Sequence, residues 1–192
     1  MFFVDYQRLL LYRVSRRGSF HGESLKPLTQ RKEEQEMVEY PRYDRVLFCT
    51  DFSKNSDHAF SYAFGISRRD GSALYIMHVM AYPNNYPHYI EGYLSTEEWK
   101  KVEESARKAI DKNFEEMYLS KIKDKSRVFT VTRSGREDEE VIEFVKKEDI
   151  DIIVVGTHGR TGIRHAVVGS VAEKIIRQSP VPVLVVPGKK GA

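Results

Sequence analysis

The sequence has little of what several classes of protein require. Cys49 is its only cysteine, so one chain can form neither a disulfide nor a cysteine metal cluster, which suits a reducing compartment. No run approaches the roughly 18 consecutive apolar residues that a membrane span needs, and no apolar segment precedes a small-residue cleavage site. The formal net charge of +3 is too small to indicate nucleic-acid binding. We therefore expect a soluble, cytoplasmic protein without a nucleic-acid partner.

From about residue 44 onward, short β-branched runs alternate with longer helical patterns, which is typical of parallel strands joined by helical crossovers. Several runs are apolar at consecutive positions, as in strands that helices cover on both faces. The expected strands are Arg45–Thr50, Ala73–Val79, Arg127–Thr132, Ile150–Val155 and Pro182–Val186. The expected helices are Asn55–Arg68, a long helix opened by the capping box Ser95–Glu98, Glu137–Lys147 and Ser170–Gln178. The sequence thus predicts an α/β domain with a central, buried sheet.

The longest expected helix carries an apolar stripe at three-to-four spacing and charged i,i+4 pairs on its other face. The stripe consists of Trp99, Val102, Ala106, Ile110, Phe114 and Met117. We expect the charged face to be a solvated surface, as in a helix that buries one side.

The first 42 residues differ from the rest, and we expect an N-terminal arm and linker there, a domain at 43–187 and a short tail at 188–192. Four arginines among the first 17 residues face one carboxylate, Asp5, in a segment rich in Phe, Tyr and Leu. A basic amphipathic arm suits a membrane surface or a partner. The alternatives, which we favour over membrane contact, are an arm packed on its own domain, a frayed terminus or a start codon placed too early.

Ligands of open parallel sheets bind beyond the carboxyl ends of the strands. Thr50 ends the first expected strand and Asp51 follows it, and Val79 ends the second. Because a carboxylate would repel phosphates, we expect Asp51 at the other end of a nucleotide, where it accepts hydrogen bonds from ribose hydroxyls or a base amino group. The alternative is that Asp51 only turns the chain or caps the next helix, a role that also suits Ser53.

The segment after the fourth expected strand is the most informative part of the sequence. Val155 is followed by Gly156-Thr157-His158-Gly159-Arg160, and Gly169 and Ser170 then open a helix. Glycines lack a Cβ, so we expect this loop to take positive φ angles and to let a polyphosphate approach backbone amides. The free N–H groups of a helix start favour an anion, and a serine hydroxyl adds a charge-assisted bond. This pattern predicts nucleotide binding, with His158 and Arg160 as further candidates for contact.

The pattern Gly-x2-Gly-x9-Gly-Ser resembles the nucleotide-binding signature of the universal stress protein family. The resemblance covers Tyr43–Pro187, and its parts agree in order and spacing. They are Val46–Ser53, His78–Val79, Asp151–Arg160, Val167–Lys174 and Pro180–Val186. The resemblance implies a flavodoxin-like fold, an open parallel five-stranded sheet of order 3-2-1-4-5 with helices on both faces.

The ATP-binding branch of the family implies a role for each matching position. Asp51 and the backbone of Val79 would hold the adenosine, and Gly156 would lie near the ribose. The phosphates would be received by Gly159, Gly169, Ser170 and the amide of Val171. Ala172 departs from the pattern, since a hydroxyl residue there would add a contact. The family also dimerises, commonly through its last strand, and the edge Val183–Val186 suits such pairing.

Other chemistry has little support in the sequence. His158 lacks neighbouring carboxylates at ligand spacing, so we expect no metal ligands from side chains, and any Mg²⁺ or Mn²⁺ would be held mainly by the phosphates. No Walker loop, Gly-x-Gly-x-x-Gly or base and nucleophile pair is present. We expect an ATP-binding, homodimeric regulatory module of the stress response. The alternatives are a dimeric interaction protein with a vestigial pocket and a slow ATP hydrolase.

Overall fold

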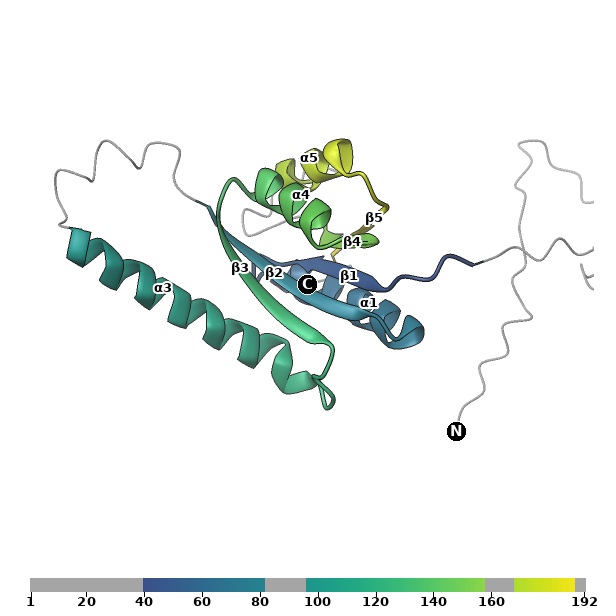
Figure 1. Ribbon diagram of the computed structural model, residues 1–192, viewed down its shortest axis with the longest axis horizontal. Coiled ribbons are helices and arrows are strands. Elements are labelled where there is room, and N and C mark those ends of the chain that lie inside the picture. The colour runs from purple at the N-terminus through teal and green to yellow at the C-terminus, as the bar shows by residue number, and fades with distance from the viewer. Residues whose placement is uncertain (1–39, 82–95, 158–167, 189–192) are drawn as a thin grey trace, which may run out of the picture. The chain divides into compact units, whose positions relative to one another are not determined.

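The computed structural model describes residues 40–81, 96–157 and 168–188. The chain divides into two compact units, Met1–Tyr40 and Pro41–Ala192, and all the elements named below belong to the second unit (Figure 1). In chain order they are β1 Arg45–Cys49, α1 Lys54–Asp70, β2 Ala73–Ala81, α3 Thr96–Met117, η2 Leu119–Lys121, β3 Val128–Gly135, α4 Glu137–Lys147, β4 Ile152–Gly156, α5 Ser170–Gln178 and β5 Val183–Val186.

The strands form one parallel, five-stranded sheet in the order β3-β2-β1-β4-β5, which confirms the predicted topology. β1 is central, with Phe48 opposite Ile76 of β2 on one side and Val154 of β4 on the other. The pairing of β2 with β3 continues to Ala81 and Gly135. Both strands are therefore longer than predicted, because ladder pairing continues past their predicted ends, through Met80 and Ala81 in β2 and through Arg133, Ser134 and Gly135 in β3.

The core lies on both faces of the sheet, as the consecutive apolar residues of β1 require. Val46, Leu47 and Phe48 have no exposed surface. Side chains alternate along a strand, so Val46 and Phe48 pack toward α1 and α3, whereas Leu47 packs toward α4 and α5. Helices therefore cover both faces, as predicted (Figure 1).

α3 buries only the second part of its predicted apolar stripe. Ile110 and Phe114 are buried, but Val102 is 49% exposed, and every described side chain before Ile110 is exposed. The side chain of Trp99 is outside the described part of the chain. The mismatch has a geometric reason: α3 has 22 residues and spans about 33 Å at 1.5 Å each, whereas the neighbouring β3 has eight and spans about 26 Å. The helix is longer than the sheet it packs on.

Local signals fix the ends of the helices that flank the site. Ser53 caps α1 by accepting a hydrogen bond from the Ser56 amide at 3.2 Å, and Gly71, with φ 73°, ends it. α4 and α5 begin and end at the predicted residues. Across the ranges that the structure describes, no helix has the length and apolarity that crossing a bilayer requires.

Candidate functional site

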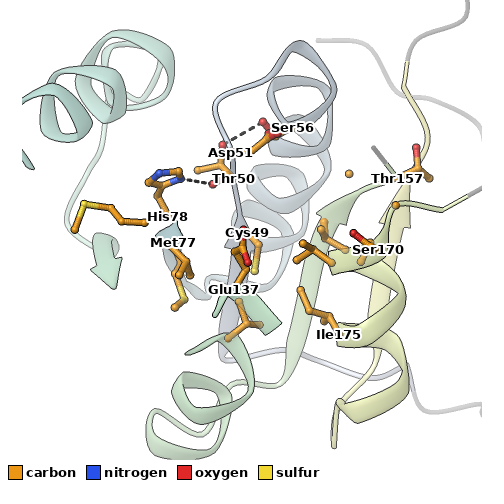
Figure 2. A pocket seen from close by; sticks show the side chains of 18 residues that line it. Cys49, Thr50, Asp51, Ser56, Met77, His78, Glu137, Thr157, Ser170 and Ile175 are labelled. Carbon is orange, nitrogen blue, oxygen red and sulfur yellow. Dashed lines mark hydrogen bonds between the residues drawn. The ribbon is translucent and has the colours of Figure 1, made fainter. Parts of the chain in front are cut away.

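A cavity of about 590 Å³ opens at the carboxyl ends of β1, β2 and β4, bordered by the starts of α4 and α5 (Figure 2). Its volume lies within the range of small-molecule sites, about 300 to 1,000 Å³. Predicted site residues that line it are Thr50, Asp51, Val79, Val155, Gly156, Thr157, Gly169, Ser170 and Val171. Three others, His158, Gly159 and Arg160, lie outside the described residues.

The turn after β1 places Asp51 at the cavity. The Asp51 carboxylate accepts a hydrogen bond from the Ser53 amide at 3.0 Å, so Asp51 does turn the chain. It also lines the cavity. Both roles that the sequence left open for Asp51 are thus compatible, while the helix cap belongs to Ser53.

His78 connects the ends of β1 and β2. Its Nδ1 lies 2.8 Å from the carbonyl oxygen of Thr50. Because a carbonyl only accepts hydrogen bonds, Nδ1 carries the proton of this contact. His78 therefore fixes the wall formed by Thr50 and Asp51, a role that no isolated motif in the sequence indicates.

The end of β4 joins the start of α5 through the backbone. The Gly169 amide donates to the Thr157 carbonyl at 2.6 Å, and the Thr157 amide donates to Val186 at 2.9 Å. The Gly169 amide is thus occupied within the protein, whereas the sequence analysis assigned it to phosphate. The next three amides of α5, those of Ser170, Val171 and Ala172, lie in its first turn, where the helix itself offers no carbonyl acceptor.

One of the two predicted reasons for glycine at 156, a positive φ angle, is wrong. Among the described glycines, only Gly71 and Gly135 have positive φ. A Cβ added at Gly156 would lie 3.5 Å from the Asn55 backbone, which is an ordinary contact. Neither the backbone angle nor the packing of the protein requires glycine at this position. The other predicted reason, close approach of a ligand to the backbone, stays a prediction.

Gly169, which has no side chain, is the N-cap residue of α5, and the part of the chain that the structure describes shows no side-chain cap hydrogen bond at this helix start. α1 differs, since Ser53 fills that role there. The uncapped amides and the positive end of the helix dipole border the cavity and suit an anion.

The opposite side of the cavity carries negative charge. Glu137, at the start of α4, lines it near Met77, as Figure 2 shows. Arg136 binds the neighbouring Asp138 and Glu139, at 3.1 and 2.7 Å. Within the described contacts Glu137 has no such counter-ion. The charge of the Glu137 carboxylate repels an anion on this side of the cavity.

Sequence reasoning missed part of the lining. The lining residues that were not predicted as site residues are Cys49, Ser56, Met77, His78, Met80, Glu137, Val141, Ala172 and Ile175. A signal existed for some of them, because alternate residues of a predicted strand share a face, which relates Met77 to Val79. The residues from α4 and α5 could not be found this way, since their placement depends on how the helices dock.

Cys49 occupies the floor of the cavity at the end of β1. Burial raises the pKa of its thiol to about 12, so the group keeps its proton near neutral pH. Within the ranges that the structure covers, no group of three or more His, Cys, Asp or Glu side chains is placed to hold a metal ion.

The comparisons with known proteins agree with this fold. The sequence model of the universal stress protein family matches residues 42–187. Universal stress protein MJ0531 of Methanocaldococcus jannaschii is 31% identical over 146 residues, which cover 75% of this chain and 82% of the relative. The solved structure of protein MJ0577 is similar with a TM-score of 0.62 and 26% identity, covering 79% of this chain and all of that one.

A further solved structure supports the fold alone. Universal stress protein UspA from Lactobacillus plantarum is 20% identical, with a TM-score of 0.64 over 77% of this chain and 99% of that one. On the match of the family model over most of its length, the chain belongs to the universal stress protein family.

Proposed function

We propose that this protein binds ATP in the cavity and acts as a nucleotide-dependent regulatory module of the stress response. The observation that carries the proposal is the uncapped start of α5 at one side of a nucleotide-sized cavity. The proposal includes a cytoplasmic location, where adenine nucleotides are available. Homodimer formation through β5 is part of the same proposal.

The phosphate end of the ligand belongs at α5. The amides of Ser170, Val171 and Ala172 begin this helix, and its dipole contributes about 0.3 to 1 kcal/mol toward an anion. A hydrogen bond from the Ser170 hydroxyl to a charged oxygen adds about 1.5 to 3 kcal/mol. Mg²⁺ or Mn²⁺ would be carried by the phosphates themselves.

The adenosine end belongs between β2 and α4. Met77, Val79 and Val141 give this part of the cavity apolar walls for a base. Asp51 supplies the acceptor for ribose hydroxyls or a base amino group. The charge of Glu137 keeps phosphates away from this end.

Replacing Ser170 by proline tests the phosphate site directly. Ser170 is the first helical residue, where proline is well tolerated, and the preceding Gly169 has φ −71° and ψ 156°, which suit a residue before proline. Ser170→Pro therefore removes one amide donor and the hydroxyl while the helix is retained. We expect at least about a tenfold loss of ATP affinity by calorimetry, the equivalent of one charge-assisted hydrogen bond.

Ser170→Ala is the matched control, because it removes the hydroxyl and keeps the amide. We expect its affinity to lie between those of the wild type and Ser170→Pro, with unchanged circular dichroism for both variants. Wild-type affinity in a folded Ser170→Pro protein would contradict the proposed phosphate site.

A further inference from the structure

A fully buried tyrosine ends the long helix beneath the turn that carries Asp51. Tyr118 lies between α3 and η2 and has no exposed surface. Its ring packs at 5.4 Å from the ring of Phe48 and at 4.7 Å from that of Phe60. These contacts fix the ring, so the direction of its hydroxyl group is also fixed.

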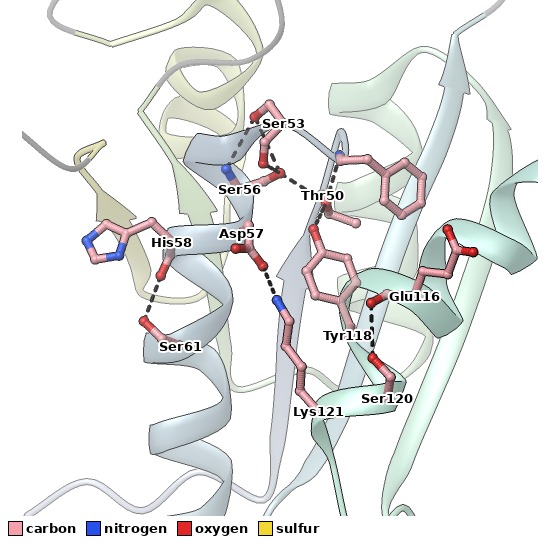
Figure 3. A network of polar contacts seen from close by, with 11 residues as sticks. Thr50, Ser53, Ser56, Asp57, His58, Ser61, Glu116, Tyr118, Ser120 and Lys121 are labelled. Atoms are coloured by element: carbon pink, nitrogen blue, oxygen red, sulfur yellow. Dashed lines mark hydrogen bonds and ion pairs between the residues drawn. The ribbon is translucent and has the colours of Figure 1, made fainter. Parts of the chain in front are cut away.

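The hydroxyl group reaches the last residue before Asp51. Tyr118 Oη lies 2.6 Å from Thr50 Oγ1, and Figure 3 shows the chain of contacts that continues from there. Thr50 Oγ1 donates to Ser56 Oγ at 3.1 Å, and Ser56 Oγ donates to the Ser53 carbonyl at 2.9 Å. Since Thr50 has one hydroxyl hydrogen and uses it toward Ser56, Tyr118 must be the donor to Thr50.

Thr50 Oγ1 also organises the backbone of the turn. It accepts the Phe52 amide at 2.9 Å, so together with the Tyr118 hydroxyl it has two donors. With its own hydrogen given to Ser56, this oxygen has reached its hydrogen-bonding capacity. A change at Tyr118 therefore alters an atom that directly holds the residue next to Asp51.

That turn is strained and needs support. Phe52 has φ 61°, a left-handed conformation that is rare for a bulky residue. Its ring is 4.5 Å from His78 and 5.2 Å from Phe114. A strained conformation persists where its surroundings hold it, and here those surroundings are the aromatic contacts and the Thr50 hydroxyl.

We propose that Tyr118 is a positioning residue, whose hydroxyl holds the Thr50–Ser53 turn so that the Asp51 carboxylate faces the adenosine part of the cavity. Tyr118 is not among the residues that line the cavity, and it comes from the turn between α3 and η2, 68 residues further along the chain than Thr50. The inference rests on the proposed function for its ligand, but the positioning of the turn can be measured without one.

Tyr118→Phe is the test, because it keeps the buried ring and removes only the oxygen. Nuclear magnetic resonance titrations with adenosine and with inorganic tripolyphosphate measure the two ends of the site separately. We expect about a three- to tenfold loss of adenosine affinity, in line with one altered hydrogen bond, and unchanged tripolyphosphate affinity. Asp51→Ala removes the carboxylate altogether, so its loss of adenosine affinity is the upper limit for a variant that only misplaces this group.

Two control variants separate positioning from general loosening. Tyr62→Phe makes the same chemical change on the exposed side of α1. Lys125→Met breaks the 3.1 Å ion pair with Glu115, which joins the segment after η2 to α3. We expect wild-type adenosine affinity from both. An equal loss in Lys125→Met, or an equal loss for adenosine and tripolyphosphate in Tyr118→Phe, would overturn the proposal.

Hydrogen exchange of the Phe52 amide gives the ligand-free measurement. This amide donates to Thr50 Oγ1, so we expect faster exchange in Tyr118→Phe and no change in either control. If the wild type binds no adenine compound, the proposed function fails while the exchange measurement still decides whether Tyr118 holds the turn. An unchanged exchange rate at Phe52 in a folded Tyr118→Phe protein would overturn the inference.

Discussion

At the scale of single residues, the most unusual environment is that of Cys49. It ends the central strand, lines the cavity, and is the only cysteine of the chain. Burial raises its pKa from 9.0 to about 12. Only the thiolate is nucleophilic, so this environment suppresses reactivity and makes the thiol a reporter of the cavity.

We predict that iodoacetamide modifies Cys49 at pH 8 about a hundredfold or more slowly in the folded protein than in urea, because the thiolate fraction falls with the raised pKa. Saturating ATP should slow the reaction further by filling the cavity. Mass spectrometry of the modified protein measures both rates. A folded protein that reacts as fast as the unfolded chain would contradict this environment for Cys49.

The raised pKa of Cys49 also predicts how the stability of the fold changes at alkaline pH. A thiol whose pKa is raised by folding stabilises the native state fully below its unfolded value of 9.0. That contribution is lost as the pH rises from there toward about 12.

Individual site residues were predictable from the sequence where a local rule applies. Asp51 follows a strand and precedes Ser53, and such a position both turns the chain and faces the ligand edge of a sheet. His78 and Glu137 were not recognised as part of the lining. Their positions depend on the docking of strands and helices, which no spacing along the chain encodes.

At the scale of elements, a buried carboxylate joins α4 to α5. The side chain of Asp138 is 3% exposed and contacts Arg136 at 3.1 Å and Lys174 at 3.8 Å. Gln178 donates to it at 3.3 Å. Burial by itself would raise the pKa of Asp138, but the hydrogen bond from Gln178 and the two positive charges outweigh it and lower the pKa.

We predict that Asp138→Asn lowers the free energy of unfolding by about 1 to 3 kcal/mol at pH 7, because it weakens the junction of the two helices. A carboxylate whose pKa is lowered by folding stabilises the protein fully above its unfolded value of 3.8, and the contribution is lost as the pH falls from there through the lower folded value. The difference between wild type and variant should therefore shrink in acid. Urea unfolding at pH 7 and in steps down to about pH 2.5 measures it, and a difference that does not depend on pH would contradict this role.

Helix boundaries were easier to predict than the burial of the helices. α4 and α5 match their predicted bounds because charge, proline and glycine signals mark their ends. The stripe of α3 looked uniform in sequence, yet its burial stops before Ile110. Periodicity shows which face of a helix is apolar, but the length of the neighbouring strand decides how much of that face is covered.

At the scale of the whole molecule, β5 forms one edge of the sheet. The amides of Ile153 and Thr157 donate to the carbonyl groups of Pro182 and Val186. Backbone groups alternate in direction along a strand, so those of Val183 and Val185 point away from β4. An apolar edge with outward donors and acceptors is what strand pairing between two copies needs.

We predict that the protein forms a homodimer and that Val185→Pro makes it monomeric. Proline removes an outward amide of β5 and leaves the bonds to β4 intact. Val185→Thr, which keeps the amide and the branched shape, is the matched control and should stay dimeric. Analytical ultracentrifugation gives the masses, and a dimer that survives Val185→Pro would rule out pairing through this edge.

The sheet order was predictable as a whole because each strand carries a local pattern and the family fixes how they connect. Dimer formation could not be predicted in the same way, because an exposed strand edge indicates where two copies can pair but not that they do. The role of residues 1–39 was likewise not predictable, because their composition suits several roles. These residues also lie outside the described structure.

The central place of β1 has a consequence for synthesis on the ribosome. One of its neighbours, β2, follows closely, but Asp151, which receives the Arg45 amide at the start of β4, comes 106 residues later. Until that segment has left the exit tunnel, β1, whose Val46, Leu47 and Phe48 are fully buried in the native fold, has one unpaired edge, which can pair with other nascent chains. β1, the first of the described strands to be translated, is therefore among the last to be completed, and we expect the growing polypeptide to benefit from chaperone protection until β4 emerges.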